Sequence, residues 1–299
     1  MSRAVTLSLH AVVCTVHDAR PLVLAIERDP PALPSGPFEP ERDRTLELAL
    51  RGWVREQTAL PLGYVEQLYT FGDQGRTATP DHVVSVGYLA LTRMERPGAN
   101  WRSWYAAFPW EDWRDGRPTV LDRIEPVLRE WAQAAPDERP PSINLGRMAR
   151  FRLAFAMWDE ERVLERYELL YEAGLVREAQ ADGRAAPHPL MDATGRPMAF
   201  DHRRILATAI ARLRAKVKYR PVVFELMPDT FTLSQLQATV ETIFGRVLHT
   251  QNFRRLVERA ELVEPTGGKA PAKGGRPAAL YRFRRAVLSE RPAPGLAIR

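Results

Sequence analysis

The sequence predicts an α+β protein, and three observations lead to this prediction. Apolar, β-branched runs at residues 4–16, 21–28 and 82–92 have the composition of strands. Between them, residues 46–57 repeat apolar side chains every four positions, which is typical of a helix. From residue 198 onward the pattern becomes helical and ends in a basic hairpin. The length of 299 residues is compatible with two domains or with one large domain.

The first part of the chain alternates strands with helices. "DARP" marks the turn between the first two strands, and a proline-rich loop fills residues 29–43. Leu46, Leu50 and Val54 form the buried stripe of the first helix. The stretch "YVEQLYTFGD" predicts a short strand and turn, and residues 120–133 predict another helix.

The sequence predicts that the middle of the chain is a polar segment that contains one helix. Residues 136–147 are rich in proline and arginine and predict a linker, and residues 177–197 predict a polar loop. Between them lies a helix at about 159–174, with Asp159 as its cap and Gly174 at its end. We therefore expect three parts, namely a first domain at 1–135, an inserted segment at 136–197, and a last domain at 198–299.

The charge is unevenly distributed along the chain. Residues 201–299 contain 19 Lys and Arg against 8 Asp and Glu, whereas residues 1–200 contain 24 against 29. A basic last third indicates a polyanionic partner or, equally, a solvated basic surface. One cysteine, Cys14, excludes a disulfide within the chain. The sequence shows neither a signal peptide nor a membrane span, so we expect a cytoplasmic protein.

The first helix lies where a metal-binding helix is expected. "LPSG", a helix ending in "REQTAL", and then "EQLYTFGD" and "VVSVGYLAL" together resemble the Nudix fold. In Nudix hydrolases this loop and helix bind divalent metal and cleave nucleoside diphosphate derivatives, and three glutamates on one helix face hold the ions. Here those positions are Trp53, Glu56 and Gln57. We therefore expect no catalysis, no metal and no cofactor, and we interpret Glu56 as a brace for the preceding loop.

The last third contains a helix-turn-helix pattern. Thr232 or Ser234 begins a first helix over residues 233–244, and Gly245 ends it. Thr250 is predicted to cap a second helix over residues 251–260. The core side of that helix consists of Phe253, Leu256 and Val257, and its early polar residues are those that reach DNA in such motifs, namely Gln251, Asn252, Arg254 and Arg255.

A basic hairpin follows the second helix. Val263 and residues 280–283 predict two strands around a glycine-rich tip that carries Lys269, Lys273 and Arg276. Such a wing contacts phosphate or the minor groove. Each arginine alone is better explained as a solvated side chain, but the array together with the wing favours DNA binding. The predicted architecture is a Nudix-like α/β/α sandwich followed by a winged helix-turn-helix domain.

The two halves together resemble the Nudix-related transcriptional regulators of NAD metabolism. The stretches "EQLYTFGD", "FDH", "KVKY" and "NFRR" carry this resemblance over about residues 5–108 and 198–285. It implies a repressor that binds an operator in double-stranded DNA, releases it on binding ADP-ribose or a related nucleotide, and controls NAD-related genes. The alternatives are an active Nudix hydrolase with a nucleic-acid-binding module, and a structural DNA-binding protein without a ligand.

About 85 residues, roughly 110–195, depart from that resemblance. They predict an enlarged sensor domain, an oligomerisation element or a lid, and the periodic helix favours packing. For the effector we expect Arg28 to bind pyrophosphate, and Tyr69 and Phe71 to stack on a base. The alternative is that Tyr69 and Phe71 belong to the core, which is favoured for Phe71. Because one helix-turn-helix reads only a half-site, we also expect a homodimer.

Overall fold

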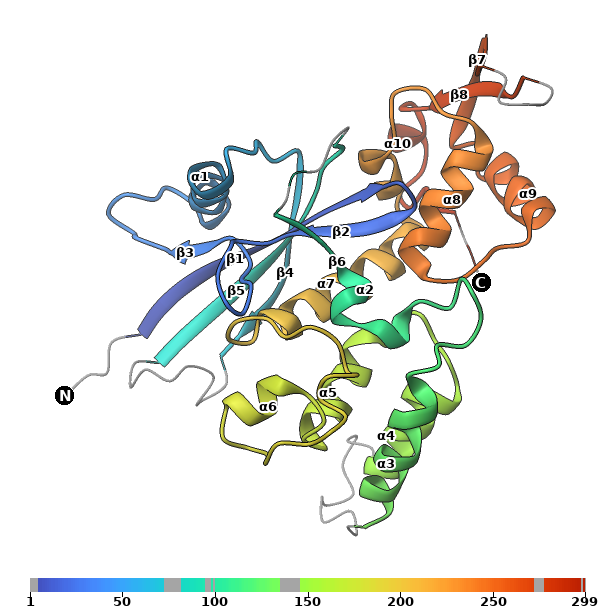
Figure 1. Cartoon of the computed structure of the whole chain (residues 1–299). Coiled ribbons are helices and arrows are strands. Elements are labelled where there is room, and N and C mark those ends of the chain that lie inside the picture. The colour runs from blue at the N-terminus through green and yellow to red at the C-terminus, as the bar shows by residue number, and fades with distance from the viewer. Residues whose placement is uncertain are drawn as a thin grey trace.

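A mixed six-stranded sheet forms the centre of the first domain (Figure 1). The structure is a computed structural model that describes residues 5–72, 82–94, 98, 100–134, 146–271, 277–296 and 298. The strand order is β4-β5-β1-β2-β6, and β3 pairs with β1 beside this path. The strands are β1 (Val5–His17), β2 (Arg20–Leu24), β3 (Ser35–Pro37), β4 (Tyr64–Phe71), β5 (His82–Leu91) and β6 (Trp101–Ser103).

The long central strand β1 organises the sheet. It pairs in parallel with β5 from Val5 to Cys14, and antiparallel with β2 across a tight turn. Asp18 and Ala19 both have positive φ at that turn, 48° and 53°, which matches the twist of a hairpin. Side chains of β1 alternate between two cores, as a pleated strand requires, so the predicted strands and turn are confirmed.

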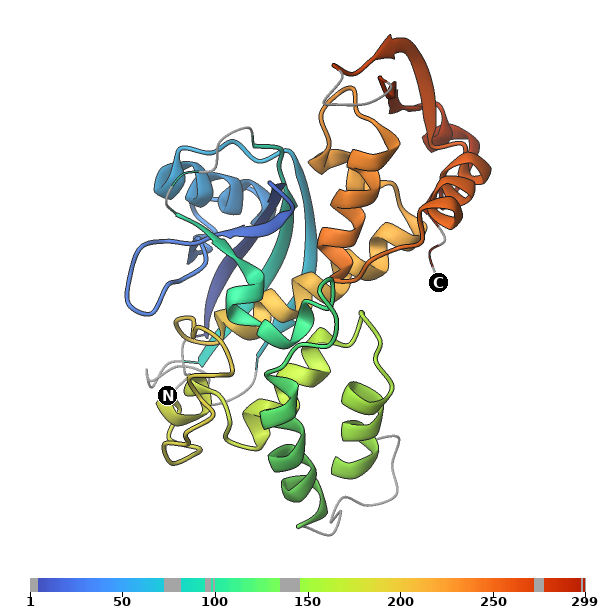
Figure 2. The ribbon, with the colours of Figure 1, turned by 45° about the vertical axis from the view of Figure 1, so that its right-hand side comes forward.

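Two helices cover opposite faces of the sheet (Figures 1 and 2). Helix α1 (Leu46–Thr58) begins at Thr45, whose hydroxyl accepts a hydrogen bond from the Leu48 amide, and it buries Leu50 and Val54. Helix α7 (His202–Tyr219) lies on the other face. A Cβ added to Gly87 of β5 would lie 3.2 Å from the side chain of Ile205 in α7, so sheet and helix are in close contact. The predicted α/β/α sandwich is confirmed.

Helix α7 changes the interpretation of the domain boundary. The sequence-based division at residue 198 assigns it to the DNA-binding domain, whereas in the structure it packs on β1, β4 and β5. Its Lys216 and Arg212 bind Glu66 of β4. Burial alone would raise the pKa of Glu66, but hydrogen bonds from Lys216 and Tyr64 outweigh it and lower the pKa. We therefore propose a boundary after α7.

The inserted segment is helical and shares the core of the first domain. The elements α2 (Trp104–Ala107), η1 (Pro109–Glu111) and α3 (Leu121–Gln133) precede it. Its own elements are α4 (Arg147–Phe151), the π-helical turn η2 (Arg152–Ala156), α5 (Val163–Glu172) and α6 (Arg177–Ala181). Buried side chains of α5, α7 and α8 belong to one continuous hydrophobic cluster. This packing agrees with the packing role favoured by the sequence.

Two details of this segment correct the sequence analysis. Asp159 does not cap α5, since Arg162 lies at the cap position and Asp159 instead accepts a hydrogen bond from the Glu161 amide. The segment predicted as a polar loop at 177–197 contains the short helix α6. Gly174, with φ +72°, follows the end of α5 as expected. Most of the predicted linker at 136–147 lies outside the described residues.

The last part of the chain forms a helical lobe with a hairpin, and its α8 packs against α7, β1 and β2 (Figure 1). Within the described residues, no helix combines the length and apolarity needed to cross a membrane. The elements of this lobe are η3 (Val222–Leu226), α8 (Leu233–Phe244), α9 (Thr250–Ala260), β7 (Val263–Lys269), β8 (Ala279–Phe283) and α10 (Val287–Glu290).

Candidate nucleic-acid interface and sensor site

Helix α8 has strong local signals at both ends. Thr232 and Gln235 form a reciprocal capping box, with side-chain to backbone hydrogen bonds of 2.8 and 3.2 Å. Gly245 ends the helix at φ +69°. The turn toward α9 is tied back to α8, because Gln237 donates to the Leu248 carbonyl and Glu241 accepts from the Leu248 amide. The predicted bounds of this helix are confirmed.

The second helix, α9, begins one residue earlier than predicted. Its cap is His249, and Thr250 is its first helical residue, so the assignment of Thr250 as the cap is wrong. The Thr250 hydroxyl instead lies 3.4 Å from the Gln237 side-chain amide. Phe253 and Val257 are buried, as the apolar pattern predicts.

The outward face of α9 is polar and exposed. At about 100° per residue, Arg255 lies about 200° around the helix from both Phe253 and Val257 and points away from the core. Gln251 shares this direction, whereas Arg254 lies on the flank, about 100° from Phe253. The Arg255 guanidinium donates to the side-chain carbonyl of Asn252. This arrangement suits Arg255 for a groove and Arg254 for the DNA backbone.

Three further arginines lie beside this polar face and were missed in the sequence analysis, although Arg246 pairs with Glu160 and Arg291 with Glu261. Arg246, Arg259 and Arg291 line a hollow that also contains Asn252 and Arg255. Arg259 could have been predicted from the sequence, because it follows Arg255 by four positions on the same helix and therefore lies on the same side. Arg291 comes from beyond the hairpin, so spacing within the helix could not reveal it.

The wing is present as an antiparallel hairpin. Val263 pairs with Phe283, and Phe231 adds a bridge to Tyr281 with backbone hydrogen bonds of 2.8 and 2.9 Å. Lys269 is the last residue of β7 and is exposed. The predicted wing-tip residues Lys273 and Arg276 lie outside the described residues, and their role stays a prediction.

The helix that carries metal ligands in Nudix hydrolases has a different role here. The Trp53 indole covers Gly36 and donates to the Pro37 carbonyl at 2.9 Å. A Cβ on Gly36 would lie 2.2 Å from this ring. The Gln57 amide pairs with both backbone groups of Ser35, at 2.7 and 3.1 Å.

These contacts correct the interpretation of Glu56. Gln57, not Glu56, braces the preceding loop, while Glu56 is exposed and accepts no hydrogen bond from the described residues. Among the described residues, no group of three or more His, Cys, Asp or Glu side chains is arranged to hold a metal ion.

Of the three residues proposed for the effector, Tyr69 and Phe71 contact each other, whereas Arg28 contacts Phe200. Tyr69 is 61% exposed and meets Phe71 edge to face, whereas Phe71 is 5% exposed and belongs to the core, the alternative that the sequence left open. The Arg28 guanidinium lies over the Phe200 ring, 5.0 Å from its centre. The structure therefore places Arg28 beside Phe200 of the "FDH" stretch. His202 of the same stretch accepts a hydrogen bond from the Leu33 amide.

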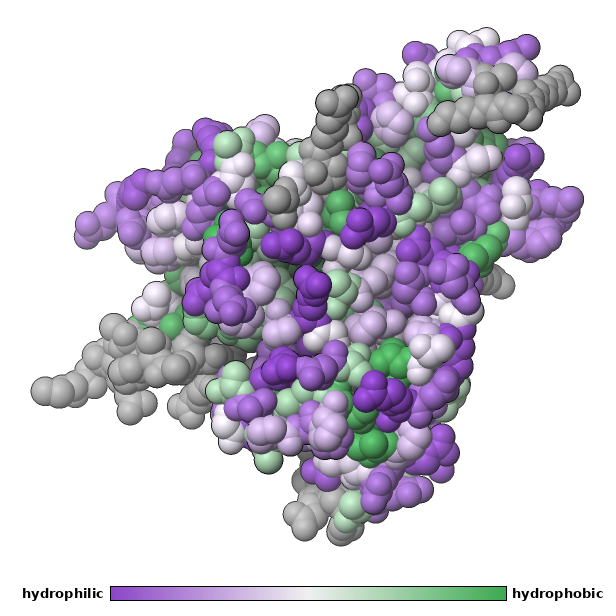
Figure 3. All heavy atoms as spheres, in the orientation of Figure 1, coloured by the Kyte–Doolittle hydropathy of each residue, from purple (hydrophilic) through white to green (hydrophobic). Residues whose placement is uncertain are grey.

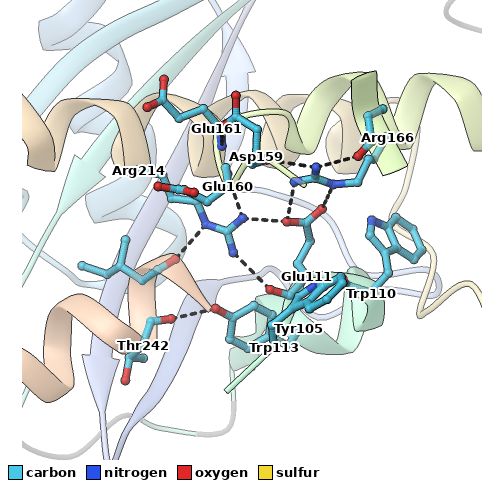
Figure 4. Close-up of polar contacts among 12 residues, drawn as sticks. Tyr105, Trp110, Glu111, Trp113, Asp159, Glu160, Glu161, Arg166, Arg214 and Thr242 are labelled. Atoms are coloured by element: carbon cyan, nitrogen blue, oxygen red, sulfur yellow. Dashed lines mark hydrogen bonds and ion pairs between the residues drawn. The ribbon is translucent and has the colours of Figure 1, made fainter. Parts of the chain in front are cut away.

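A buried carboxylate connects the sensor body with the helix-turn-helix (Figure 4). Glu111 lies between Arg166 of α5 and Arg214 of α7, at 2.5 and 2.6 Å, and all three side chains are inaccessible to solvent. Burial alone would raise the pKa of Glu111, but the two guanidiniums outweigh it and hold its pKa below the usual range. Arg214 also donates to the Ile243 carbonyl of α8 at 2.8 Å.

Neighbouring backbone contacts reinforce this connection. The Tyr105 hydroxyl donates to the Thr242 carbonyl at 2.8 Å, and the Trp113 amide donates to the Gly245 carbonyl at 2.6 Å. Arg246, in the turn before α9, binds Glu160 of the inserted segment at 3.1 Å. The inserted segment is therefore in direct contact with the helix-turn-helix.

Comparisons with known proteins agree with this architecture. The family of NrtR DNA-binding winged helix domains matches residues 223–283. The ADPR responsive transcriptional repressor NtrR of Acinetobacter baylyi is 43% identical over 86 residues, which are 29% of this chain and 34% of that protein. The matched stretch thus spans about a third of the relative.

Two solved structures have a similar fold over most of their length. NrtR of Shewanella oneidensis, crystallised with a 27mer DNA, superposes with a TM-score of 0.54 at 25% identity, covering 95% of both chains. A MutT/nudix family protein from Enterococcus faecalis has the same TM-score at 17% identity, covering 95% of this chain and 88% of that protein, which is evidence for the fold alone. The chain thus combines a Nudix-like domain with an NrtR-type DNA-binding winged helix domain, which is the architecture of the Nudix-related transcriptional regulators.

Proposed function

We propose that this protein is a transcriptional repressor that binds operator DNA and senses a nucleotide metabolite through its Nudix-like domain. The outward face of α9 carries this proposal, because Gln251 and Arg255 lie opposite the buried Phe253 and Val257. Amide and guanidinium groups are the natural readers of adenine and guanine edges in the major groove. The name of the Acinetobacter relative supports ADP-ribose as the effector and repression as the mode of action.

The decisive experiment measures DNA binding with and without the effector. Genome-wide mapping of bound DNA in the source organism should identify the operator, and we propose that it lies beside NAD-related genes. Fluorescence anisotropy with this operator should then show specific binding that weakens when ADP-ribose is added. Equal binding to operator and scrambled DNA would contradict the repressor proposal, and unchanged binding with ADP-ribose would contradict the effector.

We also propose that the Nudix-like domain does not hydrolyse nucleotides. Trp53 and Gln57 bind backbone groups of the preceding loop, and neither side chain has a carboxylate to offer Mg²⁺. Incubation with ADP-ribose, NADH or dinucleoside polyphosphates plus Mg²⁺ or Mn²⁺ should therefore yield no product by chromatography. Turnover faster than about 1 s⁻¹ would favour the hydrolase alternative instead.

We also propose that the protein acts as a homodimer. One recognition helix reads a half-site, and a palindromic operator presents two half-sites about 34–36 Å apart. We expect light scattering to give twice the chain mass of 33.9 kDa, alone or on operator DNA. A monomeric mass in both conditions would disprove this prediction.

A further inference from the structure

An apolar hollow opens on the α7 side of the sheet, away from the degenerate Nudix helix. Its volume is about 340 Å³, within the usual range of small-molecule sites. Val23 of β2 and Leu206 of α7 form part of its floor, and Met198 closes it from the segment before α7. Val23 belongs to the core cluster shared with α7, whereas its neighbour Leu24 belongs to the cluster shared with α1. The hollow and helix α1 therefore lie on opposite faces.

Three arginines surround this hollow, and they come from distant parts of the sequence. They are Arg20 at the start of β2, Arg102 in β6 and Arg196 before α7. All three are exposed, and none has a side-chain hydrogen bond or ion pair with another described residue. None of the described lining residues is acidic. Figure 3 shows hydrophilic side chains gathered over this part of the molecule, around β2, β6 and α2.

Several other arginines of the same domain have a carboxylate partner, which the three arginines at this hollow lack within the described part of the chain. Arg114 pairs with Asp112, Arg177 with Asp192, and Arg204 with Glu168. The three arginines bring positive charge to one hollow, and no described lining residue is acidic, which favours an anion there. Guanidinium groups bind phosphate with two parallel hydrogen bonds, so a phosphorylated ligand would satisfy this arrangement.

The backbone holds one of these arginines firmly in place. Gly195 has φ +88°, and a Cβ there would lie 2.4 Å from the Ala107 carbonyl oxygen, so only glycine allows this close approach. The Arg196 amide then donates to the Ala106 carbonyl at 2.8 Å. The segment that carries Arg196 is thereby fixed against α2.

The backbone conformation and exposure of Phe200 also support a ligand site beside the hollow. It has φ +55°, a conformation that residues other than glycine adopt at a cost, and its ring is 53% exposed. Arg28 stacks on this ring. The Ala199 amide donates to the carbonyl of Pro31, which lines the hollow, so the backbone just before Phe200 runs beside the hollow.

We propose that this hollow binds the diphosphate of a nucleotide effector, with Arg20, Arg102 and Arg196 on the phosphates. This assignment rests on the proposed function, in which the Nudix-like domain senses a nucleotide. The apolar floor accepts the sugar or base, and the exposed Phe200 ring offers a surface for stacking. DNA is a poor occupant, because the exposed face of α9 and the wing belong to a different lobe (Figures 1 and 2).

The test is isothermal titration calorimetry with the full chain, using ADP-ribose and inorganic pyrophosphate as probes. Arg20→Gln, Arg102→Gln and Arg196→Gln are measured singly and together. Each should weaken ADP-ribose binding about tenfold, and the triple variant about a hundredfold or more. The matched control is Arg42→Gln, a 69% exposed arginine in the loop before α1, which should bind as wild type. Unfolding midpoints should stay unchanged, since all three side chains are exposed.

The outcomes separate the site from the proposed function. If the triple variant binds both probes as wild type does, or if wild type binds neither probe, the site is wrong. The triple variant could fail to bind ADP-ribose while ADP-ribose leaves operator binding of the wild type unchanged. That result would support the binding site and contradict ADP-ribose as the effector. If Arg42→Gln weakens binding as much as the three arginine variants, the effect is general charge attraction and the site is wrong.

Discussion

Replacing Glu111 by glutamine should lower the free energy of unfolding by about 3–5 kcal/mol, because removing one partner leaves buried charges uncompensated. Both Arg166 and Arg214 would lose their charged partner in a region without solvent contact. Urea unfolding followed by circular dichroism measures the change. The control is Glu47→Gln, which breaks an exposed pair with Arg51 and should cost less than about 1 kcal/mol. Equal losses in the two variants would contradict the buried role of Glu111.

The same carboxylate predicts a pH dependence. The pKa of Glu111 is lower in the folded protein than its usual value, so its contribution to stability is complete above the usual glutamate range. This contribution is lost as the pH falls through the lower, folded pKa. As the pH falls from the usual glutamate pKa range to the lower, folded pKa, Glu111→Gln should therefore lose less stability than wild type. An acid limb that is identical in the two proteins would contradict this assignment.

Arg255→Ala should weaken operator binding by about 1–3 kcal/mol and relax the preference at one base position. Arg254→Ala should weaken binding to all sequences alike and reduce the salt dependence, as expected for a phosphate contact. The reason is their position on α9, with Arg255 opposite the core and Arg254 on the flank. Affinities are measured across a salt series with base-substituted operators. If both variants lose affinity equally on every sequence, Arg255 has no groove contact.

Sequence-based prediction was most accurate for elements whose ends are determined by neighbouring residues. The first and last residues of α8 were predicted correctly, because the signals for its ends, Thr232 with Gln235 and Gly245, lie at those ends in the sequence. Apolar and β-branched composition predicted β1, β2, β4 and β5, whereas the three-residue strands β3 and β6 were missed. Cap assignments failed at Asp159 and Thr250, since a suitable side chain one to three residues away does not fix where the helix begins.

The candidate sites were predicted less well, for a physical reason. The partners of Glu111 lie 55 and 103 residues away, so nothing in "PWEDW" reveals them. Likewise, Arg20, Arg102 and Arg196 meet only because β2, β6 and the segment before α7 are neighbours in the fold. The missing Nudix carboxylates were visible in sequence, but the brace formed by Gln57 depends on the path of β3.

The end of α8 has a consequence for modularity. Three of its last carbonyls accept hydrogen bonds from Arg214, Tyr105 and Trp113, and all three donors lie outside the matched winged helix segment at 223–283. A fragment cut at the limits of that segment would return these carbonyls to water and expose apolar surface shared with α7. A fusion of the DNA-binding unit to another sensor would therefore have to include the segments that carry Arg214, Tyr105 and Trp113.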